Sequence, residues 1–150
     1  MRRMVVKLGL ALAAVVLLAS ACSKSSSTTG GASASISGGG GTITVGSDTA
    51  NNHGSTDASG KSSLSVEAND FYFAPTVLTG KAGQSLTLNI SNEGSTTHNF
   101  STTASGDDPS NDVQAGSSIT VTVKFPQSGI LEFYCRFHRA QGMVGELSIS

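Results

Sequence analysis

The chain has 150 residues, of which 13% are charged, and its formal net charge is -1. It lacks the basic surplus with which nucleic-acid-binding proteins neutralise phosphates, so we expect no nucleic-acid partner. The length leaves room for one small domain beside targeting and linking segments, and we expect that domain to be a monomer.

Residues 1–21 have the anatomy of an export signal. Three basic residues precede an apolar run from Leu8 to Leu18, which is shorter than the roughly 20 residues of a transmembrane helix. The run ends in Ala19-Ser20-Ala21-Cys22, which is typical of a bacterial lipoprotein signal. We therefore expect cleavage before Cys22, lipid on its sulfur, and an extracytoplasmic protein anchored to the cell membrane or in the periplasm.

Simple secretion is the alternative, because Ala19-Ser20-Ala21 would also suit an ordinary signal peptidase. Cys22 would then be a free thiol without a partner in an oxidising compartment, which favours the lipid-anchored interpretation.

Residues 22–62 are dominated by Ser, Gly, Thr and Ala, a composition that predicts a disordered tether. A flexible coil of about forty residues has a mean reach of roughly 35 Å. Thr42-Ile-Thr-Val45 is the one alternating patch, and four residues flanked by glycines predict at best a fragment of strand. His53 is isolated in this segment, so we expect it to be solvated.

Residues 63–150 alternate apolar with polar residues at period two, which predicts an all-β, antiparallel β-sandwich in one small domain. Turn-forming residues separate the segments, and no helical period is present. The clearest expected strands are Leu64–Ala68, Leu86–Ile90, Ile119–Phe125 and Val144–Ile149.

The domain contains few residues that bind metals strongly, and they form one set: His98, Cys135, His138 and Met143. Cys135, His138 and Met143 share one short loop before the last expected strand. A thiolate, two imidazoles and a weak thioether are the ligands that suit a copper ion cycling between its two oxidation states. The sequence therefore predicts one type 1 copper ion.

Three segments carry a resemblance to a known family. They are Phe73-Ala-Pro75 followed by Lys81-Ala-Gly83, then His98-Asn99, and finally Gly129–Gly145, in which Cys135, His138 and Met143 are spaced by three and five residues. This pattern resembles the cupredoxins of the plastocyanin, pseudoazurin and amicyanin group. The resemblance covers the chain from Leu64 onward and implies a Greek-key sandwich that carries single electrons between redox proteins.

The resemblance also implies roles for residues around the ligands. Asn99 would hold the ligand loop by hydrogen bonds near the Cys135 sulfur, and His138 would be the route for electrons to and from a donor and an acceptor. Phe137 stands where the family often has proline and could supply an apolar contact. The remaining candidates for the exit route or partner surface are Tyr134, Arg136 and Arg139. The two arginines could form a basic rim for an acidic partner, or could simply be solvated.

Other functions remain possible at this point. Zinc could take one thiolate and two imidazoles, but a thioether adds nothing for zinc. A Cys135–His138 nucleophile pair would suggest an enzyme, although the further domains and copper centres of related copper enzymes are not in this chain. Copper storage or delivery is the main alternative, and calcium at Asp107, Asp108, Asn111 and Asp112 is a minor one, because that spacing fits no EF-hand loop.

Overall fold

The computed structural model describes residues 38–150, so the predicted signal, the lipidation site at Cys22 and the first part of the predicted tether lie outside the described residues. Thirteen strands and two short 3-10 helices make up the described part, and no α-helix occurs in it. No helix of residues 38–150 is long and apolar enough to cross a membrane.

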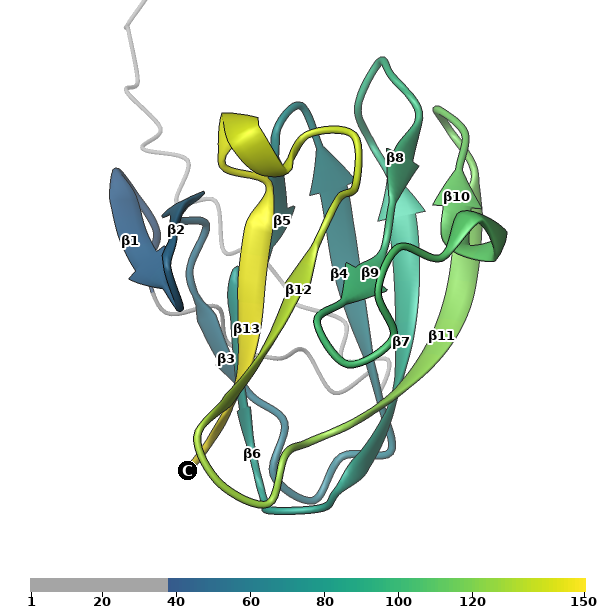
Figure 1. Ribbon diagram of the computed structural model, residues 1–150. Helices are drawn as coiled ribbons and strands as arrows, with labels where there is room; N and C mark the ends of the chain where they lie inside the picture. The colour runs from purple at the N-terminus through teal and green to yellow at the C-terminus, as the bar shows by residue number, and fades with distance from the viewer. Residues whose placement is uncertain (1–37) are drawn as a thin grey trace, which may run out of the picture. The chain divides into compact units, whose positions relative to one another are not determined.

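The strands form two main sheets, which face each other across the core (Figure 1). One sheet has the order β11-β7-β4-β5 and the other the order β3-β6-β13-β12-β9, with small two-stranded additions, β1-β2 and β8-β10. The strands are β1 (Thr42–Val45), β2 (Asp48–Asn51), β3 (Ser55–Asp57), β4 (Ser63–Asn69), β5 (Tyr72–Ala74), β6 (Val77–Gly80), β7 (Ser85–Asn92), β8 (His98–Asn99), β9 (Ser101–Thr102), β10 (Asp112–Val113), β11 (Ser118–Lys124), β12 (Ile130–Tyr134) and β13 (Val144–Ile149); the 3-10 helices are η1 (Pro109–Asn111) and η2 (Arg139–Gln141).

The predicted β-sandwich is confirmed, and the four clearest expected strands correspond to β4, β7, β11 and β13. Alternation places one face of a strand inside most clearly in β7, where Leu86, Leu88 and Ile90 are fully buried while Asn89 is exposed. The pairing is mixed rather than wholly antiparallel, because β4–β7, β6–β13 and β3–β6 run parallel.

Three aromatic rings occupy the centre of the core. Phe133 of β12 lies with its ring centroid 5.3 Å from that of Phe73 and 5.1 Å from that of Phe100, and all three side chains are buried. The rings connect the two sheets close to the end of β12, which Cys135 directly follows. Burial of rings of this size is a main source of stability in a domain of this length.

The predicted tether is wrong for residues 42–57, which form β1, β2 and β3. A two-residue turn at Gly46-Ser47, with Gly46 at φ +57°, joins β1 to β2. Val45 and Ala50 are buried against Tyr134 and Val144, and β3 pairs with β6 at the edge of the five-stranded sheet. This segment folds because neighbouring strands supply the apolar surface that its own polar sequence lacks.

His53 is correspondingly not a solvated linker residue. Its ring stacks on Tyr72, with centroids 3.4 Å apart, and its backbone N–H donates to Thr76 Oγ1.

Candidate metal centre

The ligand loop joins β12 to β13 and is closed by its own backbone. His138 N donates to Cys135 O, Cys135 N donates to Met143 O, and Met143 N donates to His138 O, at 3.0, 3.0 and 3.2 Å. Gly142, at φ +90°, ends the single turn of η2 in a conformation that other residues rarely adopt. Cys135, His138 and Met143 are therefore carried on one compact unit.

His98 reaches the site from another part of the fold. It lies in β8, where the chain crosses from β7 of the four-stranded sheet to β9 of the five-stranded sheet. The Asn92 side chain donates to Thr96 O and Val113 O and so holds the loop before His98 in place. Figure 1 shows β8, the β4–β5 turn and the loop with η2 at the same end of the sandwich, away from the C-terminus.

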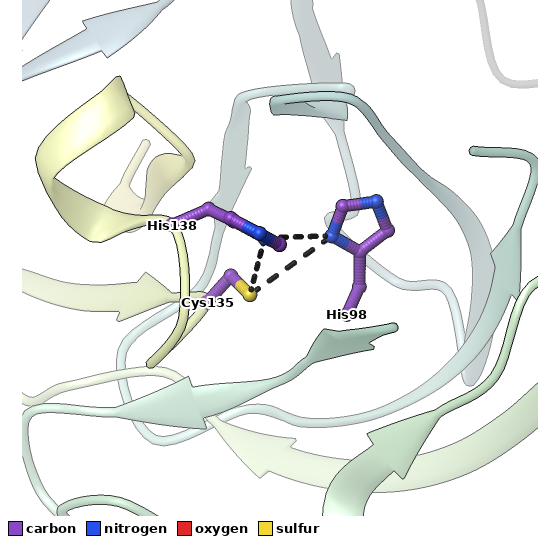
Figure 2. Close-up of side chains that lie close together, drawn as sticks. All are labelled: His98, Cys135 and His138. Carbon is purple, nitrogen blue, oxygen red and sulfur yellow. Dashed lines mark hydrogen bonds between the residues drawn. The ribbon is translucent and has the colours of Figure 1, made fainter. Parts of the chain in front are cut away.

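The two histidines and the cysteine converge on one point (Figure 2). Nδ1 of His98 and Nδ1 of His138 are 3.2 Å apart, and they lie 4.0 and 3.5 Å from the Cys135 sulfur. Three such donors placed evenly in a plane around an ion, at bond lengths of about 2.0–2.3 Å, are separated by roughly 3.5–3.8 Å. The donor set therefore fits a single metal ion in a trigonal His2Cys arrangement.

Burial sets the protonation of these donors. It raises the pKa of the Cys135 thiol, against the opposing effect of backbone N–H groups of Phe137, Asn99 and His138 that are directed at the sulfur. It lowers the pKa of His98, which a hydrogen bond to Asp70 partly opposes, and it lowers the pKa of His138. Neutral imidazoles are ready to bind a cation, and a metal ion deprotonates a thiol that it coordinates.

Met143 is fully buried in the same core cluster as Cys135. Its backbone is fixed by the hydrogen bonds that close the ligand loop. Its role as a weak axial ligand remains a prediction from the sequence.

Asn99 links the strand of His98 to the ligand loop, although not by a side-chain bond to the loop itself. Its side-chain amide donates to Asp112 Oδ1 at 2.7 Å and to Asp108 O at 2.8 Å, and its carbonyl accepts from Ser101. Asp112 in turn binds the Arg136 guanidinium through both carboxylate oxygens. The carboxylate of Asp112 is thus bound by the side chains of Asn99 and Arg136.

The two arginines beside His138 do not form a free basic rim. Arg136 is paired with Asp112, and Arg139 is paired with Asp48 and Glu132. Their guanidinium groups also lie over aromatic rings, that of Arg136 over Phe137 and that of Arg139 over Tyr134. Because each positive charge faces a carboxylate of its own chain, little net attraction remains for an acidic partner.

The other three candidates for the exit route or partner surface, His138, Phe137 and Tyr134, differ in exposure. Phe137 is 43% exposed and His138 is half-buried, so an apolar side chain stands in solvent beside the imidazole. Tyr134 is buried, and its hydroxyl donates to Asp107 Oδ1 at 2.9 Å. Tyr134 is therefore placed to pack and not to meet a partner.

Sequence reasoning missed Asp70, which lies in the β4–β5 turn. Its Oδ1 is 2.9 Å from Nε2 of His98, on the side of the ring that faces away from Cys135. Hydrogen bonds from the Ser95 hydroxyl and backbone, and one from Thr96, hold the pKa of this carboxyl well below its usual range. A single aspartate in a polar turn carries no pattern that would single it out.

Asn51 at the end of β2 was also missed, because it lies in the predicted tether. Its side-chain amide donates to Phe71 O at 2.9 Å and to Gln141 O at 2.8 Å, while its backbone N donates to Gly142 O. The Phe71 ring in turn lies 4.4 Å from the His138 ring. The N-terminal hairpin thus fastens the ligand loop to the β4–β5 turn.

The fold and the site together define a β-sandwich protein with a buried His2Cys metal centre. The model of the cupredoxin-like domain family matches residues 10–147, so the chain belongs to that family. Family membership and the His–Cys–His group confirm copper as the predicted cofactor.

Solved structures similar to this chain include an auracyanin, a plastocyanin and a multicopper oxidase. A dithionite-reduced auracyanin from the photosynthetic bacterium Roseiflexus castenholzii is 19% identical, with 60% of this chain and 98% of that chain covered and a TM-score of 0.49. An oxidised plastocyanin from Dryopteris crassirhizoma is 23% identical, covering 58% and 100%, with a TM-score of 0.43. A multicopper oxidase is 16% identical, covering 78% and 51%, with a TM-score of 0.49. No curated protein matches the chain.

Proposed function

We propose that this protein is a type 1 copper electron carrier that works outside the cytoplasm, with His98, Cys135, His138 and Met143 as its copper ligands. The observation that carries the proposal is the convergence of one buried thiol and two buried or half-buried imidazole nitrogens within 4.8 Å of one another. Copper bound there supplies a centre that accepts and releases one electron.

The surrounding residues support electron transfer because they keep the donors still. The ligand loop is closed by its own hydrogen bonds, and β8 is held by Asn92 and by pairing with β10. Donors that keep their positions when the charge at the site changes require little reorganisation. That is the property an electron carrier needs.

Burial argues against the two other functions. Cys135 and His98 are fully buried, so a substrate cannot reach the sulfur for nucleophilic attack, and copper exchange with a second protein would lack an accessible thiolate. The half-buried His138, with exposed Phe137 beside it, is the proposed route for electrons between a redox donor and acceptor.

The first test is titration of the full chain with Cu(II), followed by visible absorption and electron paramagnetic resonance. We expect an intense blue charge-transfer band, because a thiolate bound to Cu(II) is the source of that transition, and the band should bleach reversibly with a reductant. Cys135→Ala is the critical variant and should lose the band. Cys135 lies in the core, so the variant must first be shown by circular dichroism to fold.

A colourless copper complex of the wild-type protein would contradict the proposal and favour storage or delivery. Zinc bound in preference to copper would contradict it as well.

We further propose that the N-terminal signal ends before Cys22 and that lipid on Cys22 anchors the domain. The support is the signal anatomy of residues 1–21 and the otherwise unpartnered thiol. In a bacterial host fed radiolabelled fatty acid, the wild-type protein should carry label and sediment with membranes, whereas Cys22→Ala should be unlabelled. Equal labelling of both proteins, or none in either, would overturn this assignment.

A further inference from the structure

His98 has two ring nitrogens with different surroundings, and these surroundings assign its tautomer. Nδ1 faces Cys135 and His138, while Nε2 faces Asp70 Oδ1 at 2.9 Å. An ionised carboxylate can only accept a hydrogen bond, so the single hydrogen of the neutral ring belongs on Nε2. The lone pair of Nδ1 is then directed toward the centre of the donor group.

Asp70 is itself fixed by three hydrogen bonds from the loop that precedes His98. Oδ2 accepts from the Ser95 backbone N at 2.9 Å and from Ser95 Oγ at 2.6 Å, and Oδ1 accepts from Thr96 Oγ1 at 3.1 Å. The Asp70 side chain is only 26% exposed and the His98 side chain is fully buried. The carboxylate therefore has one defined position against the ring.

Gly94 shows how closely this arrangement is packed. A Cβ at this position would lie 2.6 Å from Asp70 Oδ1 and 2.8 Å from His98 Nε2, which is too close for any side chain. The absence of a side chain lets the loop pass directly over the contact between the carboxylate and the imidazole.

We propose that Asp70 is a positioning residue that fixes the tautomer and orientation of His98 and lowers the reduction potential of the bound copper. This inference rests on the proposed function. One electron enters the centre on reduction, and the site loses one unit of positive charge while the hydrogen between His98 and Asp70 stays in place. A negative charge one imidazole ring away stabilises the more positive, oxidised centre.

The test compares the copper-loaded full chain with Asp70→Asn, which keeps the shape and an acceptor atom but removes the charge. We expect the ratio of Cu(I) to Cu(II) affinity to rise on the order of tenfold, measured as a higher midpoint potential by voltammetry. Asp57→Asn is the matched control. Asp57 lies in β3 opposite Thr79 of β6, close to where the chain ends, so this variant should leave the potential unchanged.

A second readout does not need copper. In the metal-free protein, nitrogen NMR of His98 should show hydrogen on Nε2 in the wild type and a mixture of tautomers in Asp70→Ala. An unchanged potential in Asp70→Asn, or an unchanged tautomer in Asp70→Ala, would overturn the role of Asp70 even if the wild-type protein is blue. A wild-type protein without the blue band would instead overturn the proposed function, and the NMR experiment would still test the positioning role.

Discussion

A chain that begins at residue 63 is expected to be much less stable than one that begins at residue 38. Deleting residues 38–62 removes Val45 and Ala50 from the core and exposes the faces of Tyr134 and Val144 that they cover. It also leaves β6 as an open sheet edge, because β3 pairs with it at three positions.

We expect the free energy of unfolding to fall by at least about 3 kcal/mol. Full burial of one Val-sized side chain contributes roughly 1.5–3 kcal/mol, and the deleted hydrogen bonds to Thr76, Gln141 and Gly142 add to this. Urea unfolding of residues 38–150 and of residues 63–150, both free of metal, measures the difference.

A matched variant separates the contribution of the β1–β2 hairpin to stability from that of the edge strand β3. Val45→Ala in residues 38–150 keeps all three strands and should lose only the part of the stability that comes from the small apolar cluster. Equal stability of the two chain lengths would show that β1, β2 and β3 do not belong to the cooperative unit.

The second large effect is expected for Phe133→Ala. The Phe133 ring is fully buried between Phe73 and Phe100, where both sheets meet. Truncation of a buried Phe to Ala leaves a cavity and costs about 3–5 kcal/mol, which is a large share of the 5–15 kcal/mol that stabilises a typical domain. Thermal or urea unfolding of the metal-free protein measures this loss.

Phe137→Ala is the control for the same chemical change on the surface, and we expect it to alter stability by less than about 0.5 kcal/mol. The folded fraction of Phe133→Ala should still show the blue band on addition of Cu(II), because the loop that holds Cys135 is closed by its own backbone bonds. A loss in Phe133→Ala no larger than that of the control would refute the central role of this ring.

The sequence predicts those parts of the fold in which a local pattern and the tertiary structure agree. β4 and β7 bury every second residue, and the apolar residues of β11 and β13 also recur largely at every second position, so period two was sufficient to find these strands. The hairpin of β1 and β2 escaped prediction because its few apolar residues are stabilised by Tyr134 and Val144, which are distant in sequence. Local composition cannot indicate that a segment will pack against residues so distant in the sequence.

The same distinction holds at the metal centre. Cys135, His138 and His98 could be named because few side-chain types bind copper and each was scarce in the domain. The residues that position them could not be named, since Asp70 and Asn51 are common polar residues whose role depends on which atoms the fold brings next to them. The pairing of Arg136 with Asp112 likewise joins residues 24 positions apart.

The place of His98 in the fold links metal binding to the docking of the two sheets. His98 lies where the chain crosses from one sheet to the other, whereas Cys135 and His138 follow a strand of the five-stranded sheet. The donors can therefore meet only when the two sheets are docked. A ligand that binds only the docked form shifts the folding equilibrium toward it, so copper bound by these donors is expected to stabilise the packing of the two sheets against each other.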